Sequence, residues 1–383
     1  MRKTAFVVLL GVGLLAAAGV LSDAGQDQTA PRGLPPVPFP EDNPQTAEKI
    51  ALGDKLFHDT RLSTTGDVSC STCHEKEKAF TDSPLKTSEG IEKLTGTRNA
   101  PTVVNAAYFE TQFWDGRSPS LEDQALHPFT NPVEMGLKDH QPILDIVRSD
   151  AEYVKAFADV FGASGNAITM DEVTKAIAAF ERVQIAGDSP FDRWYYGGEA
   201  KALTEQQVRG FDLYINQGRC VSCHIIEQTQ ALFTDNRFHN IGVGINNIQK
   251  DVPELAGEFL EAEMTLEEVD VEVLSDARTS ELGRFAISHG FDDLGSFKTS
   301  TLRNIAVTAP YMHDGSIATL RDAVVHYNNG GVTNEGDPVN DFLSGGIRPL
   351  NLEDDQIDDL VAFLEALTSP QFAELAAQTA GEK

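Results

Sequence analysis

Two short motifs, "CSTCH" at residues 70–74 and "CVSCH" at residues 220–224, contain every cysteine of the chain. Cysteines paired in this way have three ordinary uses: two disulfides, a redox-active Cys-x-x-Cys site, or a zinc site built from all four thiolates. None of these uses requires a histidine directly after each pair. The adjacent histidines therefore favour a different chemistry.

In Cys-x-x-Cys-His, the two thiols add to the two vinyl groups of one haem, and the next imidazole reaches the iron from the same side. Two such motifs predict two covalently bound haem c groups. The residues expected to bind them are Cys70, Cys73 and His74 for the first haem, and Cys220, Cys223 and His224 for the second, with the two histidines as proximal iron ligands.

The N-terminus carries the pattern of an export signal. Arg2 and Lys3 precede an apolar run that is followed by small residues, which predicts a signal peptide over residues 1–24 and a periplasmic protein. The alternative is an uncleaved membrane anchor, because the run approaches the ~20 residues that a span needs. No other stretch is apolar and long enough, so we expect no membrane span after processing. Residues 25–45 are proline-rich and predict an extended lead-in.

The formal net charge of −29 argues against nucleic acid as a partner, because phosphates require basic surfaces. It suits a basic protein partner or a salty habitat. Acidic residues concentrate in an insertion at residues 250–283. We expect a solvated loop with a short helix there; the alternative is a docking surface for a basic redox partner.

Helical patterns flank both motifs. The segments at residues 46–59 and 204–218 precede them, and amphipathic segments at residues 170–184 and 354–368 end each half. No strand-like alternation of any length appears. The predicted fold is all-α, with two cytochrome-c-like domains at residues 46–190 and 200–370, each with one covalently bound c-type haem.

The two halves also align between these helices. When Asp115-Gly116 is placed on Asp314-Gly315, no gap is needed, and Pro128 falls on Tyr327. Proline cannot bind iron, whereas tyrosine can. We therefore expect the first haem to be open to a small molecule and the second to be closed. His326 and Met312 are alternative ligands of the second iron.

At this point the chain resembles the bacterial di-haem cytochrome c peroxidases and their relative MauG, over about residues 48–368. The motifs that carry the resemblance are "LFHDTRLSTTGDVSCSTCH", "GTRNAPTVVNAAYFETQFWDGR", "NPVEMG", "TLRNIAVTAPYMHDGS" and "LVAFLEALT". The resemblance implies a peroxidase that reduces hydrogen peroxide to water with electrons from a cytochrome c or a cupredoxin. Dimers are common in the family, so a homodimer is a further expectation.

The resemblance also assigns roles to residues outside the haem motifs. Glu134 is implied as the acid–base group above the open iron, Gln124 as a side chain that positions peroxide, and Trp114 as an electron relay between the haems. His313 is expected near the haem propionates. The candidate calcium ligands are Asn99, Thr308 and Pro310, whose oxygen atoms suit that ion. Without the motifs, Glu134 would be interpreted as a solvated carboxylate and Trp114 as a core side chain.

Two departures from the peroxidase pattern bear on function. The loop "TSEGIEKLTGTRN" has Ile91 where many relatives place a histidine that caps the first iron, so we expect that iron to be open in every oxidation state. Tyr327 stands where those relatives have methionine, as a tyrosine does in MauG. A MauG-like enzyme that oxidises residues of a partner protein is therefore one alternative, and a non-catalytic di-haem electron carrier is another.

Overall fold

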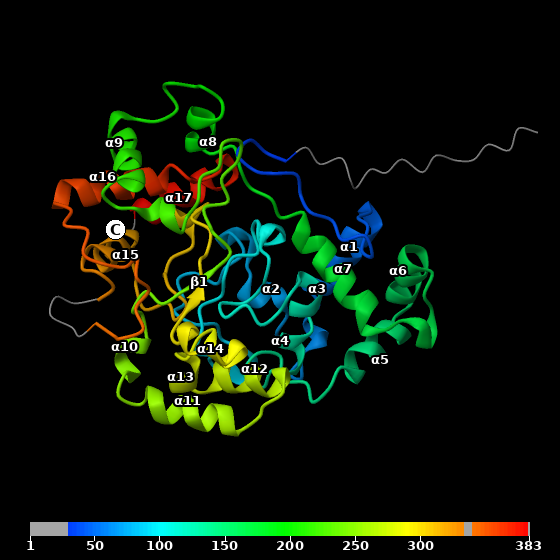
Figure 1. Ribbon diagram of the computed structural model, residues 1–383. Helices are drawn as coiled ribbons and strands as arrows, with labels where there is room; N and C mark the ends of the chain where they lie inside the picture. Colours follow the sequence, from blue (N-terminus) through cyan, green and yellow to red (C-terminus); the bar gives the residue numbers. More distant parts are fainter. Residues whose placement is uncertain (1–29, 333–338, 382–383) are drawn as a thin grey trace, which may run out of the picture.

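The computed structural model describes residues 30–332 and 339–381; the predicted signal peptide, residues 1–24, lies outside them (Figure 1). The described chain is mostly helical. Its first helices are α1 (Ala47–Phe57), α2 (Cys70–Cys73), α3 (Leu121–Gln124), α4 (His127–Thr130), α5 (Gln141–Ser149), α6 (Ala151–Phe161), α7 (Met170–Arg182) and α8 (Pro190–Tyr195). The later helices are α9 (Glu205–Ile215), α10 (Ile245–Ile248), α11 (Val252–Glu261), α12 (Leu266–Ser275), α13 (Ala277–Ser280), α14 (Phe285–Ser288), α15 (Leu320–Asn328), α16 (Asp354–Glu365) and α17 (Ala373–Gly381).

One small antiparallel sheet departs from the all-α prediction. Its strands are β1 (Phe238–His239) and β2 (Phe297–Lys298), with Phe238 opposite Lys298. Each strand has two residues, which is too short for the side-chain alternation by which a strand is recognised in a sequence. Among the residues described, no helix combines the length and the apolar character that crossing a membrane requires.

The four helices predicted to flank the motifs are confirmed, and they form two similar pairs, α1 with α7 and α9 with α16. A Cβ atom at Gly53 of α1 would lie 1.9 Å from the carbonyl oxygen of Ala176, and one at Gly210 of α9 would lie 1.9 Å from that of Asp359. Both pairs therefore cross with backbone against backbone, which only glycine permits. The same crossing occurs once in each half.

Both ends of α9 are capped by residues of the adjoining chain. The Thr204 side chain accepts a hydrogen bond from the backbone of Gln207, and the Gln207 side chain accepts one from the Thr204 backbone, which forms a capping box. At the other end of α9, the Gly218 N–H donates to the Leu213 carbonyl at 2.8 Å and closes the last turn.

The repeat extends to the loops between the helices. Gln112 pairs with Ser118 in a β-bridge, and Tyr311 pairs with Ile317 at the positions that the gapless alignment predicts. Residues Phe113 and Met312, which align with each other, both have positive φ angles, of 63° and 75°. The alignment is therefore confirmed as a structural correspondence.

Three hydrophobic clusters underlie this arrangement. One lies among α1, α5, α6 and α7, a second among α9, α15 and α16, and a third among α10 to α14. Figure 1 shows the first two helix groups on opposite sides of the molecule, with the third group beside the loops that join them.

The expectation of a solvated loop with a short helix at residues 250–283 is wrong, because most of this segment is helical and partly buried. The insertion forms α11, α12 and α13, and Val252, Leu255, Ala256 and Phe259 of α11 are buried. These residues recur at the helical spacing, which the surrounding carboxylates obscured in the sequence. Most of the acidic residues lie on the outer faces of helices that have a core of their own, whereas Asp270 of α12 is buried.

The described part of the lead-in is packed against the body of the protein. Leu34 and Val37 are buried beside Tyr108, whose hydroxyl donates to the Pro35 carbonyl at 2.9 Å. Arg303 donates to the Gly33 carbonyl at 2.6 Å. The lead-in therefore contacts residues of both halves.

Candidate haem sites

Both Cys-x-x-Cys-His motifs fold into the same short turn. The His74 N–H donates to the Cys70 carbonyl at 3.0 Å, and the His224 N–H donates to the Cys220 carbonyl at 2.9 Å. The Nδ1 atom of His74 lies 3.2 Å from the Phe80 carbonyl, and that of His224 lies 2.9 Å from the Phe233 carbonyl. These contacts place the proton on Nδ1, so each Nε2 keeps a lone pair for a metal.

The placement of the cysteines excludes two of the ordinary uses. All four are free thiols, and the two pairs line two different cavities, so they form neither disulfides nor a single four-thiolate site. Burial raises the pKa of Cys73 and of Cys220 to about 12, which leaves both thiols protonated and poor redox nucleophiles.

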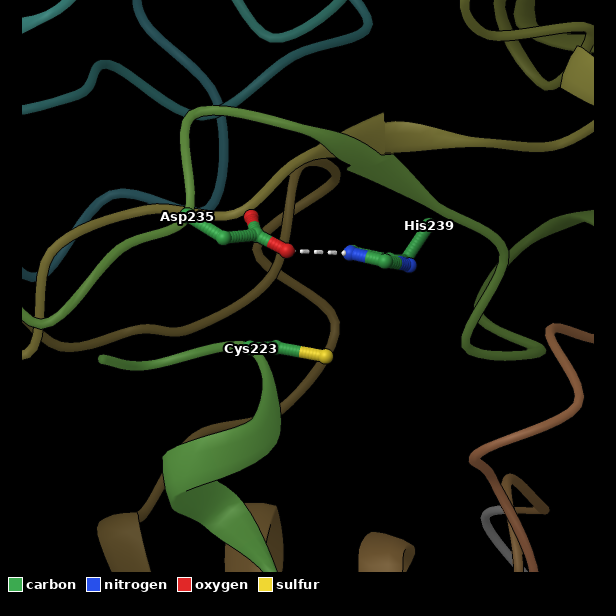
Figure 2. Close-up of side chains that lie close together, drawn as sticks. All are labelled: Cys223, Asp235 and His239. Carbon is green, nitrogen blue, oxygen red and sulfur yellow. Dashed lines mark hydrogen bonds and ion pairs between the residues drawn. The ribbon is translucent and has the colours of Figure 1, made fainter.

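Cys223 has a different environment (Figure 2). Its pKa is lowered, chiefly by a hydrogen bond with His239, and the His239 Nε2 lies 2.8 Å from the Asp235 Oδ2. The three side chains together offer a sulfur, a nitrogen and an oxygen within 4.8 Å of one another. No motif in the sequence marks His239, which lies on β1 and reaches Cys223 only through the fold.

The donor sets fit haem c in both cavities. The cavity next to His224, called here the His224 cavity, has a volume of about 590 Å³, within the ~300–1,000 Å³ usual for a cofactor. The His74 cavity, lined by Cys70, Cys73 and His74, is smaller at about 150 Å³. There the donor set, rather than the volume, matches a haem.

The acid–base residues implied by the resemblance meet in the His74 cavity. Glu134 and Gln124 both line it, and so does Pro128. The Glu134 Oε2 is buried and has no hydrogen-bond partner among the residues described. Burial, together with the charge of Asp270, raises the pKa of Glu134 to about 8 against the effect of Arg117. Glu134 is therefore a buried carboxyl that faces the cavity and is no solvated surface group.

The other side of this cavity carries no second imidazole among the described residues that line it. Ile91 does not line the cavity. Its N–H donates to the Glu134 carbonyl at 2.9 Å, and its side chain fills the space beside Gly136. The segment around Ile91 thus supports the backbone of Glu134 without placing a nitrogen ligand over the cavity.

Trp114 lies between the two cavities and lines both. Its indole N–H donates to the Asn99 carbonyl at 2.9 Å, and its own carbonyl accepts a hydrogen bond from the Lys298 N–H at 2.7 Å. Asn99 belongs to the first half and Lys298 to the second, so the first half holds the indole of Trp114 and the second holds its backbone.

The structure reduces the number of candidates for the distal ligand of the second iron. Tyr327 and Met312 line the His224 cavity, whereas His326 does not. The Nε2 of His326 lies instead 2.8 Å from the Ile241 carbonyl. Burial raises the pKa of the Tyr327 phenol, and nearby Cys220 and Cys223 contribute to the shift.

His313 and the three candidate calcium ligands line the His224 cavity as well. The His313 Nε2 lies 2.8 Å from the Glu281 Oε2, and its ring stacks on Phe297 with centroids 3.5 Å apart. The Asn99 N–H donates to the His313 carbonyl at 2.8 Å. Asn99 is therefore adjacent to His313, and Thr308 and Pro310 line the same cavity.

Three buried charged residues near these cavities were not among the predicted site residues. Arg117 and Glu181 line the His74 cavity, and Asp270 contacts Arg117. Arg117 ends the motif "FWDGR", so the motif could have identified it. Glu181 and Asp270 occur in acidic amphipathic stretches, where nothing in the sequence separates a buried carboxylate from a solvated one.

Comparisons with known proteins identify the family of the chain. Residues 47–201 match the family described as di-haem cytochrome c peroxidase. The cytochrome-c peroxidase IdrP1 of Denitromonas iodatirespirans is 36% identical over 352 residues, which cover 90% of this chain and 88% of the relative. The methylamine utilization protein MauG of Methylorubrum extorquens is 35% identical over 356 residues, covering 92% and 88%. The crystal structure of a MauG-like protein associated with microbial copper homeostasis superposes with a TM-score of 0.72 at 34% identity, covering 89% of this chain and 95% of that one.

Proposed function

This chain belongs to the di-haem cytochrome c peroxidase family and is an oxidoreductase of that type, and we propose that it reduces hydrogen peroxide to water in the periplasm. The family implies two haem groups, and an electron carrier without catalysis does not fit it. The observation that carries the proposal is Glu134, whose buried Oε2 atom has no hydrogen-bond partner in the described part of the chain and which lines the same cavity as His74.

The two haems are proposed to be haem c, covalently bound at Cys70 and Cys73 and at Cys220 and Cys223. The recurring helix pairs and the two motif turns support two cytochrome-c-like domains, at residues 46–190 and 200–370. His74 and His224 would bind the irons through Nε2, because Nδ1 is occupied in both.

Peroxide reduction consumes two electrons and two protons and yields two water molecules. The haem held by His74 supplies the redox-active iron at which the O–O bond is cleaved. Glu134 can accept a proton from one oxygen of peroxide and return it to the other, since a carboxyl with a pKa near working pH serves both as base and as acid. Gln124 lines the same cavity and offers an amide that orients peroxide or water.

Electrons are proposed to reach this cavity from the His224 side. Trp114 lines both cavities and is fixed by hydrogen bonds from each half, which suits a relay. The donor would be a small cytochrome c or a cupredoxin. The acidic outer faces of α11 and α12 offer a surface for a basic donor.

Tyr327 is proposed to close the second iron, because it lines the His224 cavity, whereas His326 does not line it and has its Nε2 atom 2.8 Å from the Ile241 carbonyl. Met312 is the remaining alternative. A calcium ion held by oxygens of Asn99, Thr308 and Pro310, which all line this cavity, completes the proposed set of cofactors. Dimers are common in the family, so a homodimer belongs to the proposal.

Oxidation of residues in a partner protein, as proposed for a MauG-like enzyme, is the second candidate function. Two observations favour it: Tyr327 in the His224 cavity, and the absence of a histidine other than His74 among the described residues that line the His74 cavity. An aromatic oxygen ligand favours the oxidised iron, which would make reduction by an ordinary cytochrome c difficult.

The substitution Glu134→Gln tests the proposed role of the carboxyl. Glutamine has the same shape but cannot accept and return a proton, so we expect the peroxide-induced absorbance change of the holoprotein to slow by about 10²–10⁴-fold. Glu110→Gln is the matched control, since Glu110 is exposed and outside both cavities. A Glu134→Gln protein with unaltered resting spectra and an unaltered rate would contradict the proposal.

A further inference from the structure

Helix α12 of the acidic insertion places one carboxylate against Arg117, a residue that lines the His74 cavity. Asp270 is 3% exposed, although its neighbours Glu267 and Glu268 are exposed. Leu274, one turn further along α12, lines the His74 cavity. An element from the second half of the chain thus forms part of the site in the first half.

Asp270 holds two side chains of the first half, and each carboxylate oxygen has its own partner. The Arg117 guanidinium contacts Oδ1, with Nε at 2.8 Å and Nη2 at 2.6 Å. The Asn131 side-chain amide donates to Oδ2 at 2.7 Å. The carboxylate therefore joins two segments that lie on either side of α3 and α4 in the sequence.

The link through Asn131 leads directly to the turn that carries Glu134. The Asn131 Oδ1 accepts a hydrogen bond from the Val133 N–H at 3.1 Å, and the Asn131 carbonyl accepts one from the Glu134 N–H at 3.2 Å. Because the Asn131 amide is held by Asp270, the position of this turn depends on α12.

The contact between Asp270 and Arg117 affects the electrostatic environment of Glu134. Arg117 lines the His74 cavity and is the cation that lowers the pKa of Glu134. Its guanidinium is shared between Asp115, at 3.0 Å, and Asp270. A cation engaged by two carboxylates has less influence on a third.

We propose that Asp270 is a positioning residue for the His74 cavity. It holds the Glu134 turn through Asn131 and draws the charge of Arg117 away from Glu134. The helical insertion is then part of the peroxide site, in addition to any role of its outer surface. The statement that this cavity binds peroxide rests on the proposed function. The effect on the Glu134 carboxyl is a property of the fold.

Several titratable groups of neighbouring elements lie in or beside this cavity. Those that line it are Arg98 and Arg117 of the segment between α2 and α3, Glu181 of α7, and the thiols of Cys70 and Cys73 on α2. Asp270 of α12 contacts Arg117, and the Nδ1 of His127 of α4 lies 3.8 Å from the Asp270 Oδ1. Among them, Asp270 raises the pKa of Glu134 and Arg117 lowers it. Removing the charge of Asp270 therefore favours the carboxylate of Glu134 twice, because it removes a repulsion and releases a cation.

The test is the pH titration of the Glu134 carboxyl in the holoprotein by infrared difference spectroscopy. The carboxyl band that disappears in Glu134→Gln belongs to Glu134. In Asp270→Asn, we expect the midpoint of that band to fall by about one pH unit or more. The rate of the peroxide reaction should shift to lower pH by the same amount.

Two further variants separate positioning from a general effect. Glu267→Gln removes the same charge from the exposed face of α12, and its midpoint should match that of the wild-type protein. Asp270→Glu retains the charge, so the pH midpoint of the Glu134 band should lie close to that of the wild-type protein. This variant also keeps the inference testable if Asp270→Asn does not fold. An unshifted Glu134 midpoint in a folded Asp270→Asn protein would overturn the inference. A shifted midpoint with a normal Glu134→Gln peroxide rate would instead overturn the proposed function and leave the inference standing.

Discussion

Two buried carboxyls share the His74 cavity. Glu134 and Glu181 each have an Oε2 atom without a hydrogen-bond partner among the described residues, and burial raises the pKa of each to about 8. Glu181 lies on α7 and is 6% exposed. In the folded protein both groups hold a proton at pH values where an exposed glutamate has lost it.

This burial has a cost that depends on pH. Because the folded-state pKa of Glu181 lies above that of the unfolded chain, the folded state binds more protons between about pH 4.5 and pH 8. The associated stability is complete at low pH and is lost as the pH rises through that range. We expect the free energy of unfolding of the Glu181→Gln protein to fall less between pH 5 and pH 8 than that of the wild-type protein, by roughly 2–4 kcal/mol.

Urea unfolding followed by circular dichroism at the two pH values measures this difference. Glu110→Gln, at an exposed position, should behave as the wild-type protein does. An identical loss of stability in Glu181→Gln and wild type would show that Glu181 is ionised in the folded state and would contradict the account.

At the scale of single residues, the sequence predicted those whose chemistry is marked by a motif. The four cysteines, His74 and His224 are recognisable because a histidine follows each pair directly, and the turns support that prediction. Asp270 and Glu181 could not be predicted, because their burial depends on the packing of helices far apart in the chain. In the sequence, nothing distinguishes either residue from neighbouring carboxylates that are exposed.

The helix pairs set the geometry of both halves. Gly53 lies against the carbonyl of Ala176, and Gly210 lies against that of Asp359, each so closely that no Cβ fits. Where the backbones of two helices touch in this way, a methyl group must push the pair apart.

The substitution Gly210→Ala should therefore destabilise the protein by about 1–3 kcal/mol, in spite of the higher helix propensity of alanine. The matched control is Gly257→Ala in α11, because a Cβ atom there meets nothing within 4 Å. We expect the control to be neutral or stabilising by up to about 1 kcal/mol. Thermal unfolding of the two variants compares them directly, and a Gly210→Ala protein as stable as Gly257→Ala would show that α9 and α16 do not cross as described.

At the scale of elements, prediction succeeded where periodicity and caps coincide. The helices at both ends of each half show apolar residues at helical spacing, and Thr204 with Gln207 marks a start that the structure has. The two-residue strands leave no periodic signal. The helices of the insertion were mistaken for a loop, since a high density of carboxylates suggested solvation although Val252 and Phe259 hold a core position.

The whole molecule joins two halves of similar fold, of which the first is expected to hold an open haem and the second a closed one. Pro128 and Tyr327 occupy equivalent positions, one in each cavity, and Trp114 lies between the cavities. α12 and the lead-in cross from one half to the other, through Asp270 and through the contact of Gly33 with Arg303. The proposed function therefore depends on a difference between the two haems: the iron at His74 is expected to be open to peroxide, and the iron at His224 to be closed by a second ligand.

The electron paramagnetic resonance spectrum of the oxidised holoprotein tests this claim most directly, before and after one equivalent of peroxide. We predict one high-spin and one low-spin ferric haem at rest, and loss of the high-spin signal with peroxide. Recovery of that signal with a reduced cytochrome c would support the peroxidase, whereas loss of both signals would favour the oxidation of a partner protein. Two low-spin haems at rest would contradict the account, because a side chain of the His74 cavity, such as Met135, would then occupy the open position of the iron.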